Sequence, residues 1–162
     1  MSKTKIQNPI LPGFNADPSA LWTEYGCYVA TSTFNWFPGV SLYHSTDMVN
    51  WRLVTNILNR TTQLDLRGNG ESAGVWAPHI SYNPQTKLYY LVFTDVKSLM
   101  PRFFDLNNYV VTAPHPEGPW SDPVYLNSSG FDPALFHDDD RRIWLTNLSW
   151  EVEEGFEHPG FI

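Results

Sequence analysis

The sequence has little of what several broad classes of protein require. Cys27 is its one cysteine, so no disulfide can form within the chain. Ten Lys and Arg stand against 17 Asp and Glu, and the formal net charge is −7, which disfavours binding to phosphate-rich surfaces. No stretch approaches the roughly 18 consecutive apolar residues of a membrane span. We therefore expect no nucleic-acid partner and no membrane partner.

A targeting signal is also missing from the N-terminal residues. Residues 1–6 read MSKTKI, and no apolar segment of the kind found in signal peptides follows them. Cys27 lies in an apolar run, where a free cysteine is far more often a buried core residue than a nucleophile. The expected location is therefore the cytoplasm.

The residues that are abundant indicate a globular all-β protein. Hydrophobic residues make up 42% of the chain and aromatic residues 15%, with 7 Trp, 8 Tyr and 10 Phe. The 13 Pro and 10 Gly separate short apolar runs, and this alternation is typical of strands joined by turns. The sequence shows no convincing helical pattern.

A unit of strands and turns repeats along the chain. Pro18, Pro78 and Pro133 each open a strand, 60 and 55 residues apart (78 − 18 and 133 − 78), and Trp51 and Trp120 mark comparable outer positions. About four strands per unit predict the blades of a β-propeller, although a two-sheet sandwich is the alternative that the pattern alone leaves open. The predicted strands are 19–22, 27–32, 40–44, 52–54, 79–82, 88–93, 109–113, one after Trp120, 132–136 and 143–147, with turns at 23–26, 83–87 and 138–140.

Two of the three repeat starts carry an aspartate, namely Asp17 and Asp132. First strands line the central axis of a propeller, so these carboxylates are expected to converge at one end of it. A single Asp-Pro pair is more often only a turn or a strand-edge cap. Two copies with matching flanks favour one shared site.

Five segments resemble, in the same order, the N-terminal part of glycoside hydrolase family 43, and most closely its β-xylosidase/α-L-arabinofuranosidase branch. They are residues 8–19 (NPILPGFNADPS), 32–40 (STFNWFPGV), 44–51 (HSTDMVNW), 74–80 (GVWAPHI) and 130–136 (GFDPALF). The resemblance implies a five-bladed β-propeller, of which residues 1–162 form about two and a half blades. The remaining blades and any C-terminal β-sandwich are expected to be absent from this stretch.

The resemblance also implies a reaction. Enzymes of this branch hydrolyse the glycosidic bond of a terminal xylose or arabinofuranose in xylan oligosaccharides, with inversion, using two carboxyl groups roughly 6.5–9.5 Å apart. Asp17 matches the general base, and Asp132 matches the carboxylate that orients the general acid and raises its pKa. The substrate is a small oligosaccharide and no cofactor is implied. An axial ion such as calcium occurs in some members, but the sequence shows no metal ligand set.

Aromatic residues of the same segments match the walls of the sugar pocket, where flat apolar faces pack on the C–H groups of a ring. Without the resemblance, plain core positions would be the preferred interpretation of these aromatics. The expected substrate-binding residues are Phe34, Trp76, Trp36 with Phe37, and, on weaker grounds, Asn15 and His79.

Three other patterns carry no assigned chemistry. The acidic run 138–140 lies between two apolar strands, so a solvated hairpin turn is favoured over a metal site. The loop 68–74 lacks the Lys-Ser/Thr pair of a phosphate-binding loop. Glu117 belongs to a Glu-Gly-Pro segment like that of the family's general acid, but it precedes Asp132, so we regard it as a chance match.

No residue of this sequence matches the general acid, which follows the Asp132 motif in the family. Glu151, Glu153, Glu154 and Glu157 come after Asp132 but lack the flanking pattern. Two further functional classes therefore remain open: a non-catalytic carbohydrate-binding remnant and a protein-binding scaffold. Open blade edges would favour association with a complementing chain or with a second copy.

The sequence predicts that the 162-residue chain by itself has little or no glycosidase activity. Protonation of the leaving group contributes roughly 10²–10⁴-fold to such reactions, and an alkyl xyloside depends on it more than a nitrophenyl xyloside does. Release of xylose from an alkyl xyloside by the purified chain measures this. Robust turnover would contradict the expectation.

Overall fold

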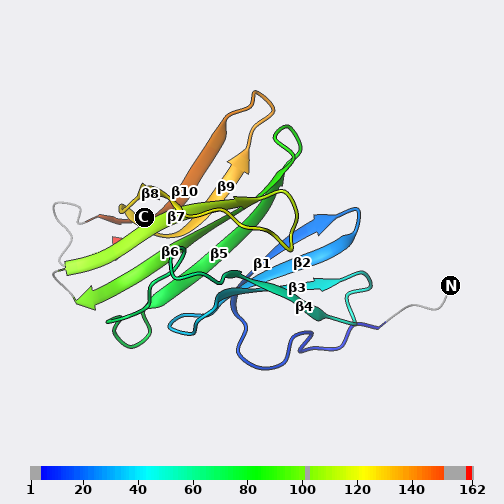
Figure 1. Cartoon of the computed structure of the whole chain (residues 1–162), viewed down its shortest axis with the longest axis horizontal. Coiled ribbons are helices and arrows are strands. Elements are labelled where there is room, and N and C mark those ends of the chain that lie inside the picture. The colour runs from blue at the N-terminus through cyan, green and yellow to red at the C-terminus, as the bar shows by residue number, and fades with distance from the viewer. Residues whose placement is uncertain (1–4, 101–102, 152–159, 162) are drawn as a thin grey trace.

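The computed structural model describes residues 5–100, 103–151 and 160–161, and within them it contains strands and turns but no helix (Figure 1). None of these residues forms a helix that could cross a membrane. The strands are β1 (Ala16–Thr23), β2 (Gly26–Ser32), β3 (Gly39–Ser45), β4 (Arg52–Leu58), β5 (Gly74–Asn83), β6 (Leu88–Met100), β7 (Phe103–Ala113), β8 (Val124–Asn127), β9 (Gly130–His137), β10 (Ile143–Glu151) and β11 (Gly160–Phe161).

The strands form three consecutive antiparallel sheets. Strands β1 to β4 pair in chain order, as do β5 to β8, and β9, β10 and β11 form a third sheet. We call these sheets blades 1, 2 and 3. The first strands lie side by side, because β5 contacts both β1 and β9 (Figure 1). Every predicted strand is present, and the predicted turns at 23–26, 83–87 and 138–140 close hairpins.

Each first strand has the same irregularity at its proline. In β1, the pairing with β2 shifts between Ala16 and Ser19, so that two residues of β1 lie opposite one residue of β2. The same shift occurs between Trp76 and His79 in β5, and opposite residues 132 and 133 in β9. A bulge of this kind bends the strand and redirects the side chain of the extra residue. The prolines that open the repeats thus mark a structural device repeated in three blades.

The main core lies between blades 1 and 2. Apolar side chains from β2, β3 and β4 on one side meet those of β5, β6 and β7 on the other, and most of them are fully buried. Leu42, Ile57 and Phe93 are among the largest of these side chains. Alternation along each strand places them on one face. This interface therefore fixes how blade 1 sits against blade 2.

Trp51 and Trp120 occupy matching places, as the sequence predicts. Each lies just before the fourth strand of its blade. The indole Nε1 of Trp51 donates to the Met48 carbonyl at 3.3 Å, and that of Trp120 donates to the Pro116 carbonyl at 3.1 Å. In both blades the indole thus closes the turn that leads to the outer strand.

The hairpin of β6 and β7 is longer than the sequence predicts. The predicted strands end at residue 93 and begin at residue 109, but the pairing continues to Met100 and Phe103. Polar residues such as Asp95 and Asn108 interrupt the apolar pattern there, although both are buried. Asn108 receives a hydrogen bond from Thr94 Oγ1 at 2.7 Å and donates to the Gly130 carbonyl at 3.0 Å. The extension carries the link to blade 3.

Blades 2 and 3 meet through polar contacts that include two neutral histidines. The Asn83 amide nitrogen contacts His137 Nδ1 at 3.2 Å, and His137 Nε2 contacts Ser81 Oγ at 2.9 Å. The Asn83 carbonyl oxygen accepts from the backbone N–H of Gln85, so the amide nitrogen faces His137. The backbone N–H of Leu135 donates to Nδ1 of His79 at 3.3 Å. Both Nδ1 atoms are therefore acceptors.

We expect this interface to weaken as the pH falls. Burial lowers the pKa of His79 and of His137 below the ordinary value of 6.5, and the positive charge of His137 lowers the pKa of His79 further. The unfolded chain then binds more protons than the folded one below about pH 6.5. The free energy of unfolding should fall from that pH down to the folded-state pKa values. Urea denaturation at several pH values measures the slope.

Asn83→Asp is the matched control for this prediction. The new carboxylate keeps an acceptor for the Gln85 N–H and places a negative charge beside His137, which favours the imidazolium form. The loss of stability between pH 6.5 and 5 should become smaller in this variant. An identical slope in both proteins would contradict the assigned role of His137.

Candidate active site

Asp17 lies in the bulge of β1, the first strand of blade 1, which contacts β5 of blade 2. Its backbone has a φ of 48°, which directs the side chain away from the regular alternation of the strand. The Ser32 hydroxyl donates to Asp17 Oδ2 at 2.7 Å. The backbone N–H of Ala77, in blade 2, donates to the same Ser32 oxygen at 2.9 Å. Asp17 is therefore held at the boundary of two blades.

Asp132 occupies the equivalent position in β9. Its φ of 54° matches that of Asp17, and it too is followed by a proline. Partial burial raises the pKa of Asp132 above its ordinary value, and the charge of Asp17 raises it further. The two carboxylates, 115 residues apart in sequence (132 − 17), thus lie within electrostatic reach of each other.

The third copy of this position is Ala77, in blade 2. It has a φ of 33° and precedes Pro78, so it repeats the backbone of Asp17 and Asp132 without their charge. Blade 2 therefore contributes a backbone N–H and aromatic surface to the site, whereas blades 1 and 3 contribute carboxylates.

Aromatic rings form a continuous row beside these positions. Ring centroids are 5.1 Å apart for Trp36 and Phe14, 5.7 Å for Phe14 and Phe34, and 6.2 Å for Phe34 and Trp76. Trp76 then meets Phe131 edge-on at 5.8 Å. The row runs from the loop after β2 across β5 to the residue before Asp132. It provides apolar faces of the kind that pack on sugar rings.

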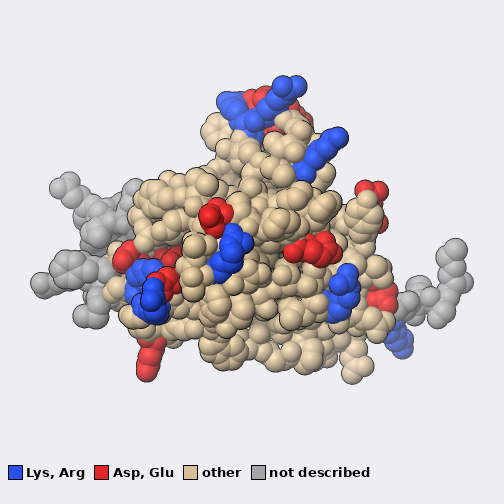
Figure 2. All heavy atoms as spheres, in the orientation of Figure 1, with Lys and Arg blue, Asp and Glu red and all other residues tan. Residues whose placement is uncertain are grey.

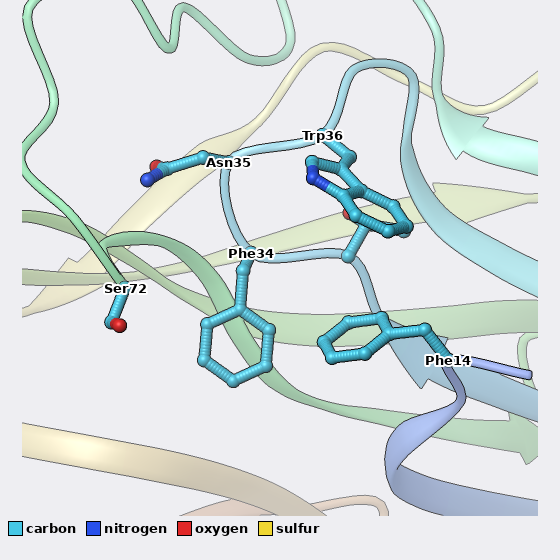
Figure 3. Close-up of a pocket in the computed structure, with 6 residues that line it drawn as sticks. Phe14, Phe34, Asn35, Trp36 and Ser72 are labelled. Carbon is cyan, nitrogen blue, oxygen red and sulfur yellow. The ribbon is translucent and has the colours of Figure 1, made fainter.

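A hollow of about 370 Å³ opens beside Phe34. In Figure 3 the rings of Phe14 and Phe34 lie side by side, and the Asn35 amide is directed toward the segment that carries Ser72. Trp36 is 66% exposed and Phe14 is 52% exposed, so their rings offer surface to a ligand. Phe37, at 49%, is exposed as well. The volume lies within the range of small-molecule sites.

The backbone of Phe34 is fixed by blade 2. Phe34 N–H donates to the Val75 carbonyl at 3.1 Å, and Val75 N–H donates back to the Phe34 carbonyl at 3.0 Å. The indole of Trp76 donates to the Ser72 carbonyl at 2.8 Å, and the Asn35 amide donates to the Gly70 carbonyl at 2.7 Å. The loop 68–74 is therefore bonded to Trp76 and to Asn35, the neighbour of Phe34.

The weaker candidates have structural contacts of their own. The Asn15 amide nitrogen donates to the carbonyls of Leu11 and Pro12, and its buried Oδ1 has no partner among the described residues. His79 accepts the Leu135 N–H described above. Neither contact involves Asp17 or Asp132, so a direct role of Asn15 and His79 in substrate binding stays a prediction.

Sequence reasoning missed Ser32 as a partner of Asp17 and did not single out Phe14 or Phe131. A signal for Ser32 was present. In a regular hairpin closed at Glu24 and Tyr25, residue 32 lies opposite residue 17, and the bulge then shifts the pairing by one. No comparable signal marks Phe131, whose contact with Trp76 joins two blades.

The acidic sequence patterns lie outside this region. Arg142 pairs with Asp140 and approaches Asp138, so residues 138–142 form a charged hairpin turn. The exposed Glu117 follows β7, whose last residue, Ala113, pairs with Tyr89 next to the β5–β6 turn. Glu117 therefore lies near the end of blade 2 that is opposite the end at Gly74. Glu153, Glu154 and Glu157 lie outside the described residues, and so does the side chain of Glu151.

Charged side chains form pairs of opposite sign at several places on the surface. In the face shown in Figure 2, basic and acidic side chains lie mostly near one another instead of forming a field of one sign. Exposed pairs such as Arg60 with Asp122 and Arg67 with Asp65 neutralise one another. In the part of the chain that the structure describes, no group of three or more His, Cys, Asp or Glu side chains is arranged to hold a metal ion.

Comparison with known proteins gives consistent matches. The sequence model of glycosyl hydrolases family 43 matches residues 6–159. Xylosidase/arabinosidase 43B of Humicola insolens is 56% identical over 147 residues, which cover 91% of this chain and 27% of that protein. The beta-xylosidase of Bacillus subtilis is 50% identical over the same shares of the two proteins. The chain spans about 27% of the length of these curated relatives.

Solved structures give the same result. The crystal structure of xylan beta-1,4-xylosidase from Bacillus halodurans C-125 superposes with a TM-score of 0.89 at 56% identity, over 96% of this chain and 29% of that one. A GH43 protein BlXynB mutant of Bacillus licheniformis gives 0.77 at 32% identity, over 85% and 28%. These neighbours are five-bladed β-propellers, and this chain forms two complete blades and part of a third.

Gly74→Ala should displace the Phe34 loop. Gly74 has a φ of 90°, and an added Cβ would lie 2.2 Å from the Phe34 carbonyl oxygen. We expect the free energy of unfolding of the whole protein to fall by about 2 kcal/mol or more, measured by urea denaturation.

Gly70→Ala is the matched control in the same loop. A Cβ there would meet no heavy atom of the described structure within 4 Å, and the Gly70 φ is not positive. Its stability should change by less than about 1 kcal/mol. Equal losses in the two variants would show that the close approach of Phe34 is not what requires glycine at residue 74.

Proposed function

This chain belongs to glycosyl hydrolase family 43, and on that basis we propose that the protein hydrolyses the glycosidic bond of a terminal xylose or arabinofuranose in xylan oligosaccharides, with inversion. The observation that carries the proposal is the pair of carboxylates on equivalent bulges, Asp17 and Asp132, beside a row of aromatic rings. Relatives named as xylosidases and arabinosidases support the same chemical class.

Asp17 is the general base in this proposal. It takes a proton from a water molecule that attacks the anomeric carbon from the face opposite the leaving group. The Ser32 hydroxyl bonds to one carboxylate oxygen, Oδ2. The other oxygen, Oδ1, receives no hydrogen bond from the described residues and is available to the water.

Asp132 acts on the general acid and not on the water. A carboxylate near the acid disfavours its ionisation, so the acid keeps its proton at a higher pH and can donate it to the leaving oxygen. The acid itself corresponds to a glutamate that follows the Asp132 motif in the family. No glutamate of this sequence has the flanking residues of that position.

The aromatic row binds the sugar. The rings of Phe34 and Trp76 are 6.2 Å apart, and Trp76 directly precedes the bulge of blade 2, so their faces can pack on the C–H groups of the terminal ring. Trp36 and Phe14 extend the surface along the hollow of Figure 3. The row is neutral, as the substrate is. Apolar contact thus holds the ring, and Asp17 is left for proton transfer.

Substitution of Asp17 in the whole protein tests the proposal. Asp17→Asn keeps the shape of the side chain but cannot accept the proton, so kcat on xylobiose should fall by roughly 10²–10⁴-fold. Calorimetry should find that xylose still binds. Proton NMR of the first product from the wild-type protein should show the anomer opposite to that of the substrate.

Three results would contradict this function. Sugar binding without hydrolysis by the wild-type whole protein would favour the carbohydrate-binding remnant. Absence of sugar binding would favour the protein-binding scaffold. Unchanged kcat in Asp17→Asn would exclude Asp17 as the base.

A further inference from the structure

Ser32 connects the carboxylate of blade 1 to the backbone of blade 2. Its side chain is 1% exposed, and its hydroxyl makes two hydrogen bonds. It donates to Asp17 Oδ2 at 2.7 Å and accepts from the backbone N–H of Ala77 at 2.9 Å. The backbone N–H can only donate, so it leaves the hydroxyl proton for Asp17. The direction of this short chain of bonds is therefore fixed.

The Ala77 N–H is available because of the bulge in β5. Ala77 and Pro78 lie between the pairs Trp76–Thr94 and His79–Val92, so Ala77 has no cross-strand partner in its own blade. A half-buried N–H needs an acceptor, and Ser32 supplies one. The irregular start of blade 2 is thereby coupled to the carboxylate of blade 1.

The corresponding hydroxyl of blade 2 has a different partner. Thr94 pairs with Trp76 as Ser32 pairs with Ala16, but Thr94 Oγ1 donates to Asn108 within its own blade. In blade 3 the equivalent residue is Leu148, which has no hydroxyl. The link from a strand hydroxyl to a carboxylate of the first strand is thus particular to Asp17 among the described blades.

We infer that Ser32 is a positioning residue for the general base, an inference that rests on the proposed function. By holding Oδ2 against blade 2, Ser32 directs Oδ1 of Asp17 toward the attacking water and ties its direction to the row of Phe34 and Trp76. The general base and the sugar-binding surface are then both positioned relative to the backbone at Ala77. Near-attack geometry of this kind affects the rate more than the binding of the sugar.

Ser32→Ala in the whole protein tests the inference. We expect kcat to fall by about tenfold to a hundredfold, the range for losing a hydrogen bond to a charged group. KM should stay within about twofold, because the aromatic surface is unchanged. Ser32→Thr keeps the hydroxyl and should recover most of the lost rate. A Ser32→Thr protein that is as slow as Ser32→Ala, while folded, would overturn the role of the hydroxyl.

Ser19→Ala is the matched control. The Ser19 hydroxyl also accepts a backbone N–H from blade 2, that of Ile80 at 3.1 Å, but it does not contact Asp17. Its loss should lower the stability as Ser32→Ala does and leave kcat unchanged. Equal loss of kcat in both variants would reduce Ser32 to a structural contact between blades.

Asp17→Asn separates the two proposals. If Asp17→Asn abolishes hydrolysis and Ser32→Ala retains the wild-type kcat, the positioning role is wrong and the proposed function stands. If Asp17→Asn is fully active, the proposed function itself is wrong. A slow Ser32→Ala with normal xylose binding by calorimetry, beside an inactive Asp17→Asn, supports both.

Discussion

The bulge before the proline of each first strand is the constraint on which the site depends. A residue with φ between 33° and 54° precedes Pro18, Pro78 and Pro133, in a backbone region that costs of order 1–3 kcal/mol per residue. The proline cannot donate to a ladder, and its neighbour is left outside the pairing. Packing against the next blade must hold this conformation. As a result, one side chain per blade leaves the regular in-and-out alternation of its strand and is directed toward the adjacent blade.

The two blade interfaces differ in what holds them. Blades 1 and 2 share a large apolar core, and the hydroxyls of Ser19 and Ser32 accept hydrogen bonds from blade 2. Blades 2 and 3 meet over a smaller apolar cluster, around Phe131, and through neutral histidines and Asn108. The position of Asp17 therefore depends mainly on hydrophobic packing, whereas that of Asp132 depends on a smaller apolar cluster together with a polar network.

Local patterns predicted the strands, the turns and the repeated prolines, because alternation and turn residues are properties of short segments. The end of the β6–β7 hairpin was not predicted, because buried Asp95 and Asn108 interrupt the apolar pattern and are compensated only by partners in the fold. The resemblance supplied the proposed roles of Asp17 and Asp132, which spacing alone could not. The bond from Ser32 to Ala77 required the structure, since it joins two blades whose packing no local pattern encodes.

Alanine at residue 77 explains how the same bulge can be repeated in three blades without placing a carboxylate in each of them. The three bulges are equivalent, so a carboxylate in every blade would place like charges on neighbouring strands and raise the pKa values of all of them. In the proposed reaction, the sugar ring and the attacking water must also fit beside Asp17. The uncharged Ala77 separates Asp17 from Asp132 by one blade, and that blade contributes Trp76, which the proposed function places against the sugar ring. Its freed N–H, acting through Ser32, is what fixes the direction of Asp17.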